Sequence, residues 1–99
     1  MNKISNSCPD TIVPPRSIVL LVDDQKSVYI ALSCILKTAT DIELHFCKEA
    51  CSAIQMAEQL QPTVILQDLN MPNISGLELL HQYRAHQTIA DVPVLILSG

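Results

Sequence analysis

The hydrophobic pattern of the chain predicts four β-strands. Residues 18–22 and 63–66 are continuous apolar or β-branched runs, which are typical of central parallel strands covered by helices on both faces, and the apolar residues 92–97 predict a fourth strand. Residues 42–47 instead alternate between apolar and polar side chains. This alternation indicates a half-exposed strand at the edge of a sheet.

Between these runs the apolar residues recur at helical spacing, so we expect three helices. In the first, residues 25–38, the apolar stripe consists of Val28, Ala31, Leu32, Ile35, Leu36 and Ala39. In the second, residues 48–60, the inward residues are Ala50, Ala53, Ile54, Ala57 and Leu60. Asp24 precedes the first helix as a candidate N-cap, and Ser75 and Glu78 open the third helix at the spacing of a capping box.

The predicted elements alternate in the order βαβαβαβ with short connections, which is the pattern of an α/β fold with a doubly wound parallel sheet. Ligands of such sheets bind beyond the carboxyl ends of the strands. Asp23 and Asp24 follow the first strand, Asp68 the third, and Ser98 the fourth. We therefore expect these four polar side chains at one rim of the sheet.

Three carboxylates at one rim repel one another, so either one acid is protonated or a cation lies among them. A carboxylate site that also admits phosphate favours Mg²⁺ or Mn²⁺ over zinc or calcium. The chain lacks the Gly-rich loops that cradle nucleotide phosphates, so a carboxylate nucleophile beside a metal remains, able to form an acyl phosphate. The alternative is that each Asp is only a helix cap or a turn former.

Composition limits the partners and the location. The 99 residues form one domain at most, and a 48% hydrophobic content excludes disorder over most of the length. With a net charge of −4 and scattered basic residues, we expect no binding to nucleic acid or to an anionic membrane. Residues 1–16 are polar and proline-containing, which predicts a flexible leader. Neither a signal peptide nor a membrane-spanning run is visible, so we expect a cytoplasmic protein.

The four cysteines do not form a recognisable disulfide framework. Cys8 lies in the predicted leader and Cys34 on the first predicted helix. His45, Cys47 and Cys51 are close in sequence, but their spacing is not that of a zinc knuckle. We expect reduced, partly buried cysteines and no metal at this group.

Four segments together resemble the receiver domain of bacterial two-component response regulators. They are Val-Asp-Asp at 22–24, Leu-Gln-Asp-Leu-Asn-Met-Pro at 66–72, Gly-Leu-Glu-Leu-Leu at 76–80 and Pro-Val-Leu-Ile-Leu-Ser at 93–98. The resemblance covers residues 17–99 and implies a flavodoxin-like fold with strand order 2-1-3-4-5. Details around residues 45–47 and 62–69 look most like receivers that precede a GGDEF diguanylate cyclase domain, which a full-length form could carry.

The resemblance also implies roles for the rim residues. Asp68 matches the phosphoacceptor, and Asp23 and Asp24 match the acidic pair that holds Mg²⁺. Asn70 matches the position whose backbone carbonyl completes the metal site, and Ser98 matches the switch hydroxyl. The implied function is a phosphorelay receiver, not an enzyme beyond Mg²⁺-dependent self-phosphorylation, whose partner is a histidine kinase or a phosphotransfer protein.

The end of the chain departs from the family pattern. Receivers continue beyond this serine with a helix, a fifth strand that ends in a lysine, and a last helix, whereas this chain stops at Gly99. We therefore expect an incomplete, C-terminally truncated receiver with four strands and three helices. An alternative is an inert or dominant-negative fragment that only binds a kinase or a full-length response regulator. A phosphohydrolase is disfavoured, because Asn70 stands where that class would need a second acid.

Overall fold

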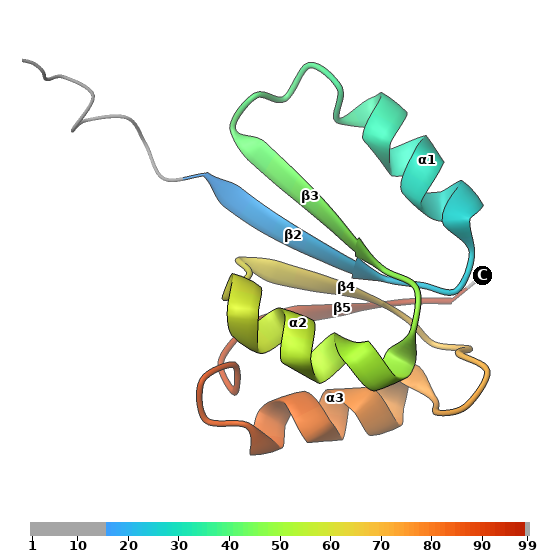
Figure 1. Ribbon diagram of the computed structural model, residues 1–99, viewed down its shortest axis with the longest axis vertical. Helices are drawn as coiled ribbons and strands as arrows, with labels where there is room; N and C mark the ends of the chain where they lie inside the picture. The colour runs from blue at the N-terminus through green and yellow to red at the C-terminus, as the bar shows by residue number, and fades with distance from the viewer. Residues whose placement is uncertain (1–15, 99) are drawn as a thin grey trace, which may run out of the picture.

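The computed structural model describes residues 16–98, which form a four-stranded parallel sheet with helices on both faces (Figure 1). The strands are β2 (Ser17–Val22), β3 (Ile42–Cys47), β4 (Val64–Asp68) and β5 (Val94–Leu97). The helices are α1 (Lys26–Ile35), the 3-10 turn η2 (Ala50–Ser52), α2 (Ala53–Leu60) and α3 (Gly76–Ala85). Figure 1 shows α1 on one face of the sheet and both α2 and α3 on the other.

The strand order confirms the predicted topology. The order is β3-β2-β4-β5, with every neighbouring pair parallel. β3, the strand with alternating residues, therefore lies at an edge, as its pattern predicted. The doubly wound α/β fold, with four strands and three α-helices between residues 16 and 98, agrees with the sequence.

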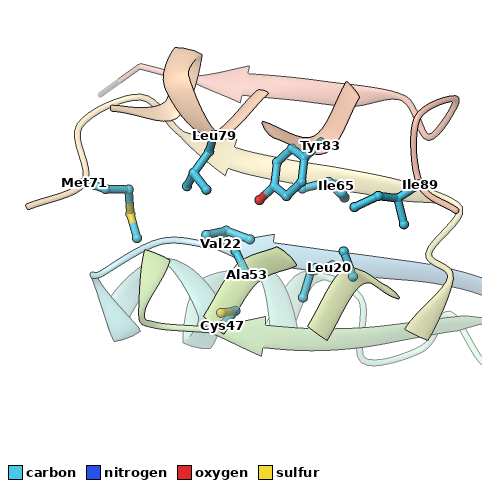
Figure 2. Packing of buried hydrophobic residues seen from close by; sticks show 10 residues of the cluster. Leu20, Val22, Cys47, Ala53, Ile65, Met71, Leu79, Tyr83 and Ile89 are labelled. Atoms are coloured by element: carbon cyan, nitrogen blue, oxygen red, sulfur yellow. The ribbon is translucent and has the colours of Figure 1, made fainter. Parts of the chain in front are cut away.

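The main core lies between the sheet and the helices α2 and α3 (Figure 2). Leu20 and Val22 of β2 and Ile65 of β4 contribute the sheet side. Leu79 and Tyr83 cover them from α3, while Ala53 and Ala57 do so from α2. The small alanines let α2 approach the sheet closely, and both were predicted to face inward.

The opposite face is less completely covered. α1 contains no buried residue, although Val28 and Leu32 of its predicted stripe are half-buried. Ala31 and Ile35 are exposed, so the prediction of one inward stripe was wrong for these residues. The physical reason is that α1 packs alone on this face of the described structure, with the ring of Tyr29 stacked on Phe46 of β3 at 4.9 Å between centroids.

Two helix starts were predicted from capping residues, with different outcomes. Ser75 is the N-cap of α3, and its Oγ accepts a hydrogen bond from the Glu78 N–H at 3.1 Å, as expected. The prediction of Asp24 as N-cap of α1 was wrong, because the helix begins one residue later, with Gln25 as an N-cap that makes no side-chain cap. Asp23 instead accepts the Gln25 N–H through Oδ1 at 2.8 Å, which leaves the Asp24 carboxylate at the rim.

The remaining predictions concern the leader, the membrane and the cysteines. The predicted leader, apart from Arg16, lies outside the described residues, as does Cys8. Across residues 16–98, every helix is too short or too polar to cross a bilayer. Cys34, Cys47 and Cys51 are free thiols in the described structure, but the prediction that the cysteines are partly buried was wrong for Cys34 and Cys51, which are exposed.

Candidate functional site

The sheet register brings the acidic residues together. β2 and β4 are adjacent and parallel, and the last pair of their ladder joins Val22 to Gln67. The next residue on each strand is therefore an aspartate, Asp23 beside Asp68. Carboxylate oxygens of Asp23, Asp24 and Asp68 all lie within 4.8 Å of one another. Within residues 16–98 this is the one group of three or more acidic, histidine or cysteine side chains placed to hold a metal.

Within the cluster, the environment of Asp23 shifts the pKa of its carboxyl group. Its side chain is buried, and that burial is the main cause that raises the pKa of Asp23 above its ordinary value. The neighbouring Asp68 and Asp24 carboxylates raise the pKa further, while the hydrogen bond from Gln25 N–H partly opposes them. Burial and the neighbouring carboxylates therefore both disfavour the ionised form of Asp23 in the folded protein, and both raise its pKa.

The backbone after β4 turns back toward the Asp68 carboxylate. The Asn70 N–H donates to Asp68 Oδ1 at 3.1 Å, and Asn70 pairs with Ser75 in an isolated antiparallel bridge. Met71 is buried in the main core, which anchors this turn. Gly76 is required at the start of α3, because a Cβ there would lie 2.4 Å from the Asp68 carbonyl oxygen.

A hollow opens over the cluster. Its cavity volume is about 290 Å³, and its lining consists of Asp23, Asp24, Gln25, Val28, Asp68 and Asn70. Carboxylates and backbone carbonyls are hard oxygen donors, which suit Mg²⁺ or Mn²⁺. The donor set therefore fits a divalent cation.

Ser98 lies at the same end of the sheet but does not line this hollow. It directly follows Leu97, which pairs with Asp68 in the β4–β5 ladder. Its side chain is exposed. The structure thus brings together four of the five predicted site residues and places the fifth next to them along the rim.

Lys48 is a basic residue that sequence reasoning did not connect to the site. It follows β3 and lines a neighbouring cavity of about 230 Å³ together with Asp24 and Pro72. Recognising it requires the order of strands in space, because β3 ends at the same rim as β2.

Gln67 and Tyr83 were also missed as polar residues near the site. Gln67 is fully buried, and its Oε1 accepts a hydrogen bond from the Tyr83 hydroxyl at 2.6 Å. Its Nε2 donates to the carbonyl oxygen of Asp68 at 3.1 Å. The available signal was the period of the strand, since Gln67 shares the inward face of β4 with Ile65.

The sequence matches a known family of domains. The family described as response regulator receiver domain matches residues 19–99. Response regulator Rcp1 of Synechocystis is 30% identical over 92 residues, covering 85% of this chain and 63% of the relative. Transcriptional regulatory protein YdfI of Bacillus subtilis is 33% identical over 81 residues, covering 81% of this chain and 37% of the relative. The chain thus spans less than two thirds of either relative.

Solved structures share the fold. The chemotaxis protein CheY4 of Vibrio cholerae superposes with a TM-score of 0.74 at 28% identity, covering 82% of this chain and 67% of that one. The response regulator domain of Thermotoga maritima CheB gives a TM-score of 0.72 at 31% identity, covering 84% and 60%. These matches confirm the flavodoxin-like fold, and together with the matched sequence they show that this chain belongs to the response regulator receiver domain family.

Proposed function

We propose that this chain is a phosphorelay receiver that accepts a phosphoryl group on Asp68. The donor is a phosphohistidine of a histidine kinase or of a phosphotransfer protein. Asp23, Asp24, Asp68 and the backbone carbonyl of Asn70 are the proposed ligands of Mg²⁺. The observation that supports this most directly is the cluster of three carboxylates within 4.8 Å at the carboxyl edge of the sheet.

In the proposed step, a carboxylate oxygen of Asp68 forms a bond to the phosphorus atom of the donor. The phosphorus–nitrogen bond breaks, and its electron pair passes to the histidine ring, which takes up a proton from solvent and leaves as neutral imidazole. Bound Mg²⁺ would neutralise the phosphoryl oxygens as charge shifts between donor and acceptor. The protein orients the acceptor, since the Asn70 N–H holds Asp68 Oδ1 and the strand ladder holds its backbone.

Ser98 is the proposed switch hydroxyl, which would turn toward the phosphoryl group and bias a two-state equilibrium. Its exposed position beside the β5 partner of Asp68 leaves it free to reorient. A GGDEF cyclase as the output domain and a cytoplasmic location remain predictions from the sequence.

The test is phosphorylation of the chain by a small phosphodonor, such as acetyl phosphate, with Mg²⁺. We expect one base-labile phosphoryl adduct per chain by intact mass, absent when Mg²⁺ is chelated. Asp68→Asn should abolish it. Asp91→Asn is the matched control with the same charge change, because Asp91 is exposed and precedes β5 at the opposite end of the sheet.

Two results would contradict the proposal. Retention of the adduct in Asp68→Asn would place the acceptor elsewhere. A wild-type chain that binds Mg²⁺ but takes no adduct from any donor would favour the alternative, a receiver that only binds its partners.

A further inference from the structure

A chain of two hydrogen bonds, buried at Tyr83 and Gln67 and half-buried at Asp68, connects helix α3 to the backbone of the proposed acceptor. The Tyr83 hydroxyl donates to Gln67 Oε1 at 2.6 Å, and Gln67 Nε2 donates to the Asp68 carbonyl oxygen at 3.1 Å. Figure 2 shows the Tyr83 ring among apolar side chains, with its hydroxyl oxygen turned into the space between the helices and the sheet. Both side chains are 0% exposed, so water does not reach these groups from the surface.

This chain of hydrogen bonds lies where the sheet itself provides less support. The ladder between β2 and β4 ends with the pair Val22–Gln67, so Asp68 lies one residue beyond it. On its other side Asp68 still pairs with Leu97 of β5. The Gln67 amide therefore binds the acceptor backbone at the point where one of its two neighbouring strands has ended.

A second contact joins α3 to the same peptide. The Gly76 N–H donates to the Leu69 carbonyl at 2.8 Å, and the Gly76 Cα packs so closely that a Cβ would lie 2.4 Å from the Asp68 carbonyl oxygen. Helix α3 thus contacts the segment around Asp68 at two places. The first is Gly76, the first residue of the helix, and the second is Tyr83, two helical turns later. Two separated contacts restrain rotation of the helix relative to the strand, which one contact would not.

We propose that Tyr83 and Gln67 are positioning residues that couple α3 to the backbone of Asp68. The inference rests on the proposed function of Asp68. A buried amide with one partner removed keeps its desolvation cost, so the side chain of Gln67 rearranges when the hydroxyl is lost. Loss of the hydroxyl then loosens the Asp68 and Leu69 peptides locally and weakens the metal site that depends on them. In the reverse direction, a ligand at Asp68 stabilises the Tyr83–Gln67 contact and the position of α3.

The decisive variant is Tyr83→Phe, which removes one oxygen atom and keeps the ring. Tyr29→Phe is the matched control, because Tyr29 stacks on Phe46 on the other face of the sheet. A second variant, Gln67→Met, keeps the side-chain length and removes both hydrogen bonds. Each variant is measured by site-resolved amide hydrogen exchange and by titration with Mg²⁺ alone.

In Tyr83→Phe we expect exchange at the Leu69 and Gly76 amides to be about tenfold faster, as loss of one buried hydrogen bond predicts. Exchange at the Asp23 amide, which donates to the Cys47 carbonyl of β3, should become faster only as far as the loss of global stability requires. Mg²⁺ affinity should fall by about threefold or more. Loss of a residue that supports a metal ligand indirectly usually lowers affinity less than loss of a residue in direct contact with that ligand. The effects of Tyr83→Phe and Gln67→Met on amide exchange should not add in the double variant, because both substitutions break the same chain of hydrogen bonds.

The proposal is overturned if exchange in Tyr83→Phe rises equally across the sheet, or if Tyr29→Phe gives the same local change. It is also overturned if the effects of Tyr83→Phe and Gln67→Met on amide exchange add fully in the double variant. Hydrogen exchange decides these points without metal. If the wild-type chain bound no Mg²⁺, the proposed function would fail while the local change in exchange would still support the coupling.

Discussion

Replacement of Asp23 by Asn is expected to stabilise the metal-free protein. Asp23 is the buried member of the acidic cluster, and its carboxylate lies within 4.8 Å of those of Asp24 and Asp68. The substitution removes one charge but keeps an oxygen that can accept the Gln25 N–H, which Asp23 Oδ1 now does at 2.8 Å. The local turn into α1 is therefore preserved while the repulsion is reduced.

The size of the effect follows from the geometry. Two unit charges at about 4.8 Å repel by roughly 3.5 kcal/mol at an effective dielectric of about 20. Asp24 and Asp68 are only half-buried, so water screens much of this energy. We expect the free energy of unfolding of Asp23→Asn at neutral pH to exceed that of the wild type by about 1–2 kcal/mol.

The pH dependence gives the sign of the effect. Burial first, and then the carboxylates of Asp68 and Asp24, raise the pKa of Asp23 in the folded protein above its ordinary value of 3.8. The folded state therefore binds this proton more tightly than the unfolded state, and the wild type loses stability as the pH rises through the raised pKa. The advantage of Asp23→Asn should be complete at pH well above that pKa and should vanish on acidification below the ordinary value.

The assay is urea denaturation of both proteins at neutral and acidic pH, with and without Mg²⁺. The wild type should gain about 2.7 kcal/mol when free Mg²⁺ is about 100 times its dissociation constant, and Asp23→Asn should gain much less. Asp91→Asn, with the same charge change at an exposed position, is the control and should show neither effect. A variant that is less stable than the wild type at neutral pH, or whose difference does not depend on pH, would refute the electrostatic reasoning.

Two further predictions concern α3. Gly76→Ala should destabilise the protein by about 1–3 kcal/mol, because the new Cβ would meet backbone atoms of Asp68 and Leu69 that cannot easily move; a variant as stable as the wild type would show that this approach is looser than described. Leu79→Ala should cost about 2–5 kcal/mol since Leu79 is 1% exposed, whereas Leu77→Ala, at a position 54% exposed, should cost under about 1 kcal/mol. All three variants are compared with the wild type by denaturant unfolding. Similar losses of unfolding free energy in Leu77→Ala and Leu79→Ala would contradict the assignment of the buried face.

Much of the architecture is determined by local periodicity along the chain. The continuous runs at residues 18–22 and 63–66 identify β2 and β4 as inner strands, and the alternation at residues 42–47 identifies β3 as an edge strand. Because all strands are parallel, acids at the carboxyl ends of β2 and β4 must reach the same rim, so the meeting of Asp23, Asp24 and Asp68 follows from their places in the sequence. The capping serine of α3 is equally local, since Ser75 and Glu78 are three residues apart.

Contacts between distant segments were decided only by the tertiary structure. The exposure of Ile35 on α1 depends on what else covers that face, which helical periodicity does not contain. The start of α1 depends on the path of the chain after β2, where Asp23 accepts the N–H of the N-cap residue Gln25 and Asp24 caps no helix amide. The link from Tyr83 to Gln67 spans 16 residues and exists because α3 lies over β4. Sequence spacing specifies which residues share a face, whereas the partner of a buried polar group is determined by how the faces pack together.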